Sequence, residues 1–186
     1  MLSESLAVAR LHSPGEAWSL THERARDAGA TALPKTASNR RVLNEIVLRL
    51  TAFSDEELAF FADEADRDEA RILLWLAICR TYRFIAEFMR DVVMDRYISY
   101  RLDLPIESFE VFFDDKAEWN DKLASLSIST RKKLGQVLFR ILREAEIISR
   151  DRKIQPAILS NRLQSMIEIT QPESFDYLPG LRRNGV

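Results

Sequence analysis

Basic side chains recur along one predicted helix, with a spacing that suits contact with a nucleic acid. The candidate residues of this helix are Arg131, Lys132, Lys133, Gln136, Arg140 and Arg143. The last four follow one another at intervals of three or four residues, so they share one face of the helix. Cations arrayed in this way release counterions from DNA, and arginine can pair with the edge of guanine. The alternative is an ordinary solvated helix face, because exposed lysine and arginine are common.

A second group of bases follows this helix. Apolar residues on both sides of residues 150–152 indicate a small two-stranded hairpin with a charged tip, and the candidate residues there are Arg150, Arg152 and Lys153. Helix, short helix, longer helix and hairpin over residues 105–154 is the order of a winged helix-turn-helix. In that arrangement the longer helix enters the major groove and the hairpin contacts phosphates. Cations at residues 131–133 oppose the dipole of their own helix, which favours an outside partner.

A weaker candidate lies nearer the start of the chain. Lys35, Arg40 and Arg41 gather at the entry of a helix predicted for residues 37–53, which follows a helix predicted for residues 14–28. These two helices could form another helix-turn-helix. The loop between them is longer than the three-to-four-residue turn of that motif. Helix capping and solvent exposure are the alternative explanation for the cluster.

Enzyme chemistry finds little support in the sequence. Neither His12 nor His22 has a cysteine or carboxylate at metal-ligand spacing, and a single cysteine, Cys79, excludes a zinc finger. Cys79 lies in an apolar run, so we expect a buried structural thiol. No Walker A loop, dinucleotide fingerprint or nucleophile elbow occurs. The sequence therefore predicts no catalytic residue, no metal site and no cofactor, and the acid-rich runs at 63–69 and 114–118 are interpreted as solvated helix ends.

Helices must position all these residues. The chain has five glycines and almost no β-branched alternation, so we predict an all-α, multi-helical fold with at most one small β-hairpin. Residues 66–98 contain no proline or glycine, and they predict one long central helix, with a kink as the alternative, that is apolar all round at residues 72–79. Ser54 and Glu57 have the spacing of a capping box. We expect an N-terminal helical region, 1–65, and a region 66–186 that holds the central helix and the winged-helix-like unit.

The basic helix itself should span residues 130–146 and pack by one apolar stripe. Ser127 or Ser129 is expected to cap it. The predicted stripe is Leu134, Val137, Leu138, Ile141, Leu142 and Ala145. An inward-facing aromatic helix should precede it within residues 105–119.

Charge is unevenly distributed along the chain, although the net charge is only -2. Residues 55–69 hold eight acids and one base, whereas residues 128–153 hold eight bases and three acids. Such segregation makes local fields that the total conceals. No apolar run approaches the roughly 20 residues of a membrane-spanning helix, and no secretory leader is visible. We therefore expect a cytoplasmic protein with no membrane partner.

Five segments carry a family resemblance. They are ESL at 4–6, EARILLWLAICRTYRFIAEF at 69–88, FEVFFDDKAEW at 109–119, STRKKLGQVLFRILRE at 129–144 and PESFDYLP at 172–179. In order and spacing they resemble the BrxA family, small helical proteins of bacteriophage exclusion (BREX) defence systems. The resemblance implies a non-enzymatic accessory protein encoded beside a methyltransferase, with a fold likened to RNA-binding antitermination factors and associated with DNA binding.

Three functions follow as hypotheses. The first is a sequence-tolerant binder of double-stranded DNA within a phage-defence complex, using the basic helix and the hairpin. The second is a protein scaffold that docks other defence-system proteins, with the basic residues merely solvated. The third keeps the basic surface but replaces DNA with RNA. Salt dependence separates the first from the second, and competition separates DNA from RNA.

Overall fold

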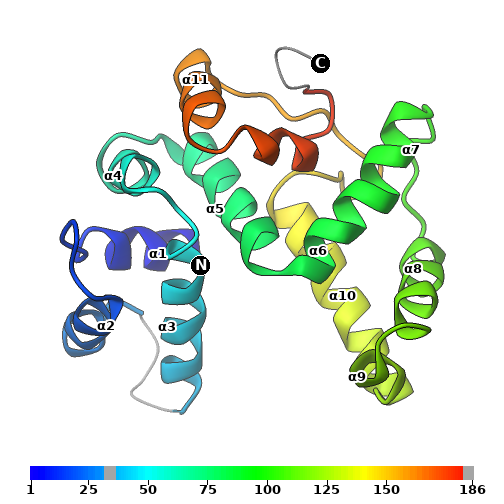
Figure 1. The fold of residues 1–186 in the computed structure, drawn as a ribbon, viewed down its shortest axis with the longest axis horizontal. Coiled ribbons are helices and arrows are strands. Elements are labelled where there is room, and N and C mark those ends of the chain that lie inside the picture. Colours follow the sequence, from blue (N-terminus) through cyan, green and yellow to red (C-terminus); the bar gives the residue numbers. More distant parts are fainter. Residues whose placement is uncertain (32–36, 182–186) are drawn as a thin grey trace. The chain divides into compact units, whose positions relative to one another are not determined.

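A computed structural model describes residues 1–31 and 37–181. The chain divides into two compact units, one of residues 1–81 and 159–170, the other of residues 82–158 and 171–186. Figure 1 shows that helices build both units, which confirms the all-α expectation. The division into regions 1–65 and 66–186 that the sequence suggested stays a prediction.

The first unit packs helices around the apolar segment of α5 (Arg67–Thr81). Its other helices are α1 (Leu2–Ala9), α2 (Trp18–Asp27), α3 (Ala37–Leu50), α4 (Asp55–Asp63) and α11 (Asn161–Thr170). The Ser54–Glu57 capping box forms as predicted, with both reciprocal hydrogen bonds. Trp75 and Leu76 of α5 are buried, as expected for a segment that is apolar on all sides.

A buried ion pair ties α4 to α5 in this unit. Glu57, whose side chain is fully buried, accepts hydrogen bonds of 2.7 and 2.9 Å from the two terminal nitrogens of Arg80. The Thr170 hydroxyl of α11 donates a further bond of 3.1 Å to the same carboxylate. Three segments that are distant in the sequence therefore meet at one desolvated charge, which needs all of these partners.

The second unit begins where the predicted long helix breaks. The prediction of a single helix over residues 66–98 is wrong, because the backbone adopts an extended conformation at Tyr82 (φ -114°, ψ 97°). The Thr81 hydroxyl donates to the Ala77 carbonyl at 2.7 Å, and such back-bonding to the preceding turn weakens or bends a helix. The chain then continues as α6 (Arg83–Phe88), a π-helical segment η1 (Met89–Met94) and α7 (Asp95–Ile98).

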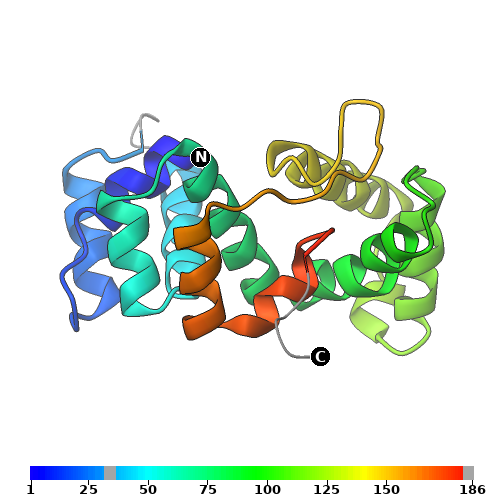
Figure 2. The same ribbon diagram turned by 90° about the horizontal axis from the view of Figure 1, so that it is seen from above.

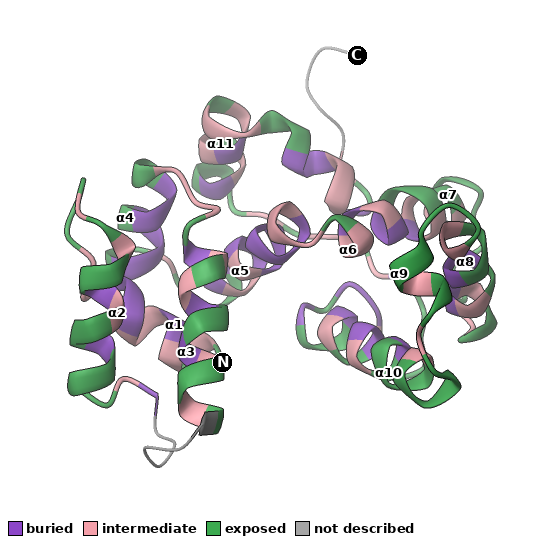
Figure 3. Cartoon of the chain, turned by 60° about the horizontal axis from the view of Figure 1, so that its bottom comes forward, coloured by how far each residue is buried: buried purple, intermediate pink, exposed green. Residues whose placement is uncertain are grey.

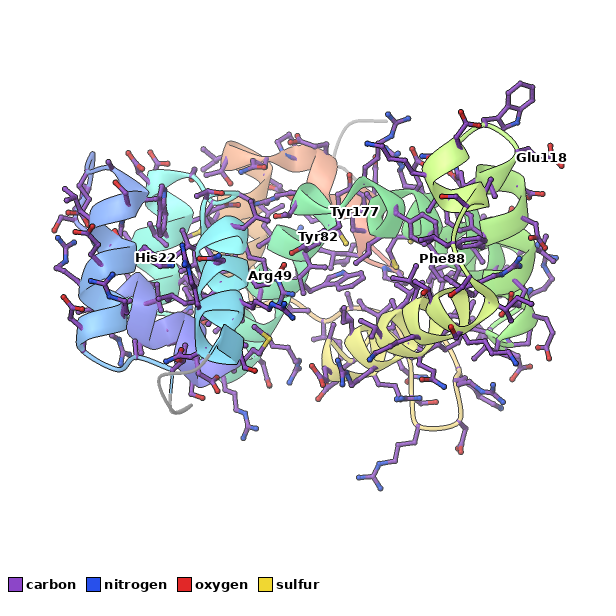
Figure 4. All side chains as sticks on the ribbon, turned by 90° about the horizontal axis from the view of Figure 1, so that it is seen from below. His22, Arg49, Tyr82, Phe88, Glu118 and Tyr177 are labelled. Atoms are coloured by element: carbon purple, nitrogen blue, oxygen red, sulfur yellow. The ribbon has the colours of Figure 1, made fainter. Side chains whose placement is uncertain are left out.

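The rest of the second unit contains the predicted functional elements. These are α8 (Glu107–Ala117), α9 (Asp121–Ala124), α10 (Ile128–Glu144) and a terminal 3-10 turn, η2 (Pro172–Tyr177). Five phenylalanine rings form its core, from α6 (Phe84, Phe88) and α8 (Phe109, Phe112, Phe113). Figure 4 shows Phe88 enclosed among the side chains of this unit, in agreement with its complete burial.

The backbone of α10 comes very close to this aromatic core. A Cβ atom added at Gly135 would lie 2.9 Å from Cδ1 of Phe109 and 3.0 Å from its Cε1. Phe109 is fully buried, so its ring has no room to move away. Glycine at residue 135 therefore allows α10 to lie directly against α8.

Replacing Glu57 with Ala should lower the free energy of unfolding by about 3–5 kcal/mol, because Arg80 would keep a buried charge without its partner. Urea denaturation measures this difference. Glu56, the exposed neighbour on α4, provides the control, and its replacement by Ala should change stability by no more than about 0.5 kcal/mol. Equal losses in the two variants would contradict the structural role of the pair.

Replacing Gly135 with Ala should destabilise the protein by about 1–3 kcal/mol through overpacking against Phe109. Thermal or urea unfolding measures the change, with Gln136→Ala on the exposed side of α10 as the matched control. A gain of about 1 kcal/mol, which is the helix-propensity advantage of alanine over glycine, would show that the close approach is unimportant.

Candidate nucleic-acid interface

Helix α10 presents its predicted basic residues to solvent. Ser127 caps the helix by accepting a hydrogen bond from the Thr130 amide at 3.3 Å, so of the two predicted caps Ser127 is the one used. In Figure 3 the buried residues of α10 lie along one side of the helix. The predicted stripe is confirmed at Leu138, Leu142 and Ala145, whereas Leu134 is 39% exposed and Phe139, which the sequence analysis omitted, is buried.

The segment after α10 forms a tight turn rather than a regular hairpin. Among the described residues it forms no strand, but Ile148 and Ile154 make an antiparallel bridge, and the Ser149 amide donates to the Lys153 carbonyl at 2.8 Å. Arg152 adopts a left-handed conformation (φ 60°) at the end of the charged tip. Figure 2 shows this turn projecting to one side of α10.

A second line of backbone bonds fixes the turn to the segment before α8. The Leu104 amide donates to the Arg152 carbonyl, and the Ile154 amide donates to the Leu102 carbonyl, each at 2.8 Å. Asp103 and Lys153 form a further antiparallel bridge. The tip is therefore held in place on both sides, which limits where its arginine side chains can reach.

The structure brings four of the predicted residues together around one hollow. Gln136 and Arg143 from α10 and Arg150 and Arg152 from the turn line a depression of about 230 Å³. Ile106 and Phe139 complete the lining. Sequence reasoning missed these two apolar residues. Ile106 lies directly before α8, and Phe139 lay outside the predicted stripe.

None of the three arginines around this hollow has a carboxylate partner within the part of the chain that the structure describes. Lys132, Lys133 and Lys153 are exposed as well. Arg140 is loosely paired with Glu144, at 3.9 Å. Most of the predicted bases of α10 and the turn are therefore uncompensated.

Arg131 behaves differently from its neighbours. Its guanidinium makes ion pairs with Glu110 and Asp114 of α8, donates to the Glu110 carbonyl at 2.7 Å and lies 4.6 Å from the centre of the Phe113 ring. The guanidinium lowers the pKa of the Asp114 carboxyl. The explanation drawn from the helix dipole does not hold for this residue, because internal carboxylates compensate it, and its contact with a nucleic acid stays a prediction.

The weaker cluster lies in the first unit. Lys35 falls outside the described residues. Arg40 and Arg41 are exposed on α3, and Arg40 lines a separate depression of about 690 Å³ between α2 and α3. In that depression His22 and Asn44 share a hydrogen bond of 2.7 Å.

Metal binding, thiol chemistry and membrane insertion are the remaining points on which the sequence raised expectations. Among residues 1–31 and 37–181 no group of three or more His, Cys, Asp or Glu side chains could hold a metal ion. Cys79 is buried as predicted, and burial raises the pKa of its thiol, so it is a poor nucleophile. Within the same residues no helix is both long and apolar enough to cross a membrane.

Comparison with known proteins places the chain in a family. The BrxA family matches residues 1–170. The BREX protein BrxA of Bacillus cereus (strain H3081.97) is 29% identical over 110 residues, which are 59% of this chain and 55% of that protein. The BREX protein BrxA of Escherichia coli O9:H4 (strain HS) is 27% identical over 152 residues, 80% of this chain and 70% of that protein. The chain thus spans about half the length of the first relative.

The fold also matches a solved structure. A crystal structure of an uncharacterized protein from Magnetospirillum magneticum superposes with a TM-score of 0.70 at 20% sequence identity. The match covers 89% of this chain and 85% of that one. At this level of identity the likeness shows a shared fold.

Replacing Arg131 with Met should raise the pKa of the Asp114 carboxyl toward its ordinary value, because the guanidinium that holds it down is removed. NMR titration of the carboxyl carbons measures the shift. Arg140→Met, which removes an exposed base of the same helix, should leave the Asp114 titration unchanged. An Asp114 pKa that is insensitive to Arg131 would show that this ion pair does not persist in solution.

Proposed function

This chain belongs to the BrxA family, and from that premise we propose that it is a non-enzymatic, duplex-DNA-binding accessory protein of a bacterial phage-defence (BREX) system. The other proteins of that system are its proposed protein partners. The family supplies the setting, because relatives that match the chain are BREX proteins. The DNA-binding part of the proposal rests on the basic surface of α10 and the turn that follows it.

One observation carries the DNA-binding proposal. Arg143, Arg150 and Arg152 come from two elements, surround one hollow and lack carboxylate partners among the described residues. Arginine keeps its charge at all physiological pH values, so three guanidinium groups held together repel one another. A phosphate placed among them would relieve this repulsion and accept several charge-assisted hydrogen bonds.

The order of elements supports duplex DNA in particular. A helix, one helical turn, a longer helix and a projecting turn follow one another from α8 to residue 154. In a winged helix-turn-helix the exposed beginning of the longer helix reads the major groove, while the wing contacts the backbone. Lys132 and Lys133 would then lie near base edges, and the arginines of the turn would lie near phosphates.

Affinity for a fluorescent random-sequence duplex should fall steeply with salt, because each neutralised phosphate contributes about 0.9 to the logarithmic slope. The double variant Arg143→Glu/Arg150→Glu should bind more weakly and should reduce that slope by about 2. Fluorescence anisotropy over a salt series measures both quantities.

The matched control is Arg67→Glu/Arg90→Glu, which changes the net charge equally at exposed residues outside the proposed surface. Equal weakening by both double variants would mean that only overall charge matters and would remove the proposed site. Competition with a duplex RNA of the same length tests the RNA alternative, which predicts that RNA displaces DNA more effectively than unlabelled DNA does.

A further inference from the structure

A groove beside α8 is unrelated to the basic surface. It has a volume of about 580 Å³ and lies within the second unit, with η1 and α7 along one side and α8 along the other. None of the predicted nucleic-acid-binding residues lines it. Glu118, which follows the end of α8, lies at the outer edge of this unit (Figure 4).

Large apolar side chains stand exposed in this groove. Trp119 is 89% exposed and Val111 is 62% exposed, and both belong to the groove lining. Single exposed apolar residues are ordinary, but two of them on one concave surface are typical of an interaction site. Tryptophan is also among the residues that contribute most to binding energy in protein interfaces.

Acidic and apolar residues alternate along a ridge formed by α8 and the turn that follows it. Glu107, Val111, Asp115 and Trp119 follow one another at intervals of four residues and all line the groove. Residues at this spacing form the ridge that a second helix packs against. A helix laid in the groove would therefore meet acid, apolar, acid and apolar side chains in turn.

The charge of the groove lining is negative on balance, with four acids against three bases. Lys116 is engaged by Glu87 at 2.8 Å and by Asp91 at 3.1 Å, and Arg101 is engaged by Asp95 at 2.6 Å. Arg96, the third base, donates to the Asp103 carbonyl at 2.7 Å. Glu107 and Asp115 have no ion-pair partner within the described part of the chain. These carboxylates would repel the phosphates of DNA and attract a basic ligand.

We propose that this groove binds a basic amphipathic helix of a partner protein, with lysine or arginine opposite Glu107 and Asp115 and apolar side chains against Val111 and Trp119. Helix-in-groove recognition uses this kind of spacing. A second copy of this chain is a poor match through its own basic helix. The exposed ridge of α10 reads Ile128, Lys132, Gln136, Arg140 and Glu144, so a glutamine and not an apolar residue would face Val111 when its bases face the acids.

Three synthetic helical peptides of equal length test this proposal on the full chain. The first alternates leucine and arginine at four-residue spacing, the second has glutamate in place of arginine, and the third has serine in place of leucine. Anisotropy of a labelled peptide should show binding of the first only. The tryptophan emission of the protein should shift to shorter wavelength as Trp119 leaves water, and this shift should vanish in Trp119→Phe.

Substitutions in the groove should weaken binding of the leucine–arginine peptide. Glu107→Lys/Asp115→Lys and Trp119→Ala should each reduce its affinity roughly tenfold or more, as expected for removal of charge complementarity and of an aromatic anchor. Glu23→Lys/Glu56→Lys, which makes the same charge change at exposed residues of the first unit, should have little effect. The duplex-DNA assay should be unaffected by Trp119→Ala, so this proposal and the DNA-binding proposal can fail separately.

Several results would overturn the proposal. These are absence of binding by the leucine–arginine peptide, equal binding of the glutamate or serine peptide, and full binding by the Glu107→Lys/Asp115→Lys protein. Sedimentation of the protein alone tests whether a second copy of this chain occupies the groove instead. Self-association that Glu107→Lys/Asp115→Lys abolishes would make the groove an interface between copies of this chain and would also overturn the proposal.

Discussion

The five phenylalanine rings of the second unit fix the two helices, α8 and α10, that carry its proposed binding surfaces. Phe84 and Phe88 lie with their ring centres 5.1 and 5.2 Å from that of Phe112, edge to face, which is a favourable aromatic geometry. Because these rings fix α8 from its inner side, Val111 on its other side and Trp119 in the turn after the helix are left exposed. Because Gly135 rests on Phe109, α10 is fixed as well, and its basic residues are left facing solvent.

Charge is sorted across this core. Glu110 and Asp114, the α8 carboxylates that face α10, form ion pairs with Arg131. They therefore do not neutralise the other bases of α10. The carboxylates of α8 that line the groove, Glu107 and Asp115, have no such partner among the described residues. The segment from α8 to the turn after α10 thus carries a positive surface and a negative one, although the chain as a whole is nearly neutral. Opposite fields of this kind allow two ligands of different charge to bind without mutual interference.

Sequence reasoning succeeded where a feature depends on near neighbours in the chain. The Ser54 capping box, the burial of Cys79 and the apolar segment of α5 depend on residue type and helical spacing, which are visible directly. The prediction of a single long helix failed because no proline or glycine marks Tyr82, where the backbone becomes extended.

The sequence by itself determined the helical class, most helix ends, the excess of bases after residue 128 and the family resemblance. The tertiary structure decided which of those bases are uncompensated. Arg131 and Asp114 are 17 residues apart along the chain, and helical periodicity carries no information about whether such residues meet. Likewise, only the path of the turn gathers Arg143, Arg150 and Arg152 around one hollow. Charge compensation depends on distance in space, whereas a sequence pattern reports spacing along one helix, and for that reason the structure was needed to separate a solvated base from a paired one.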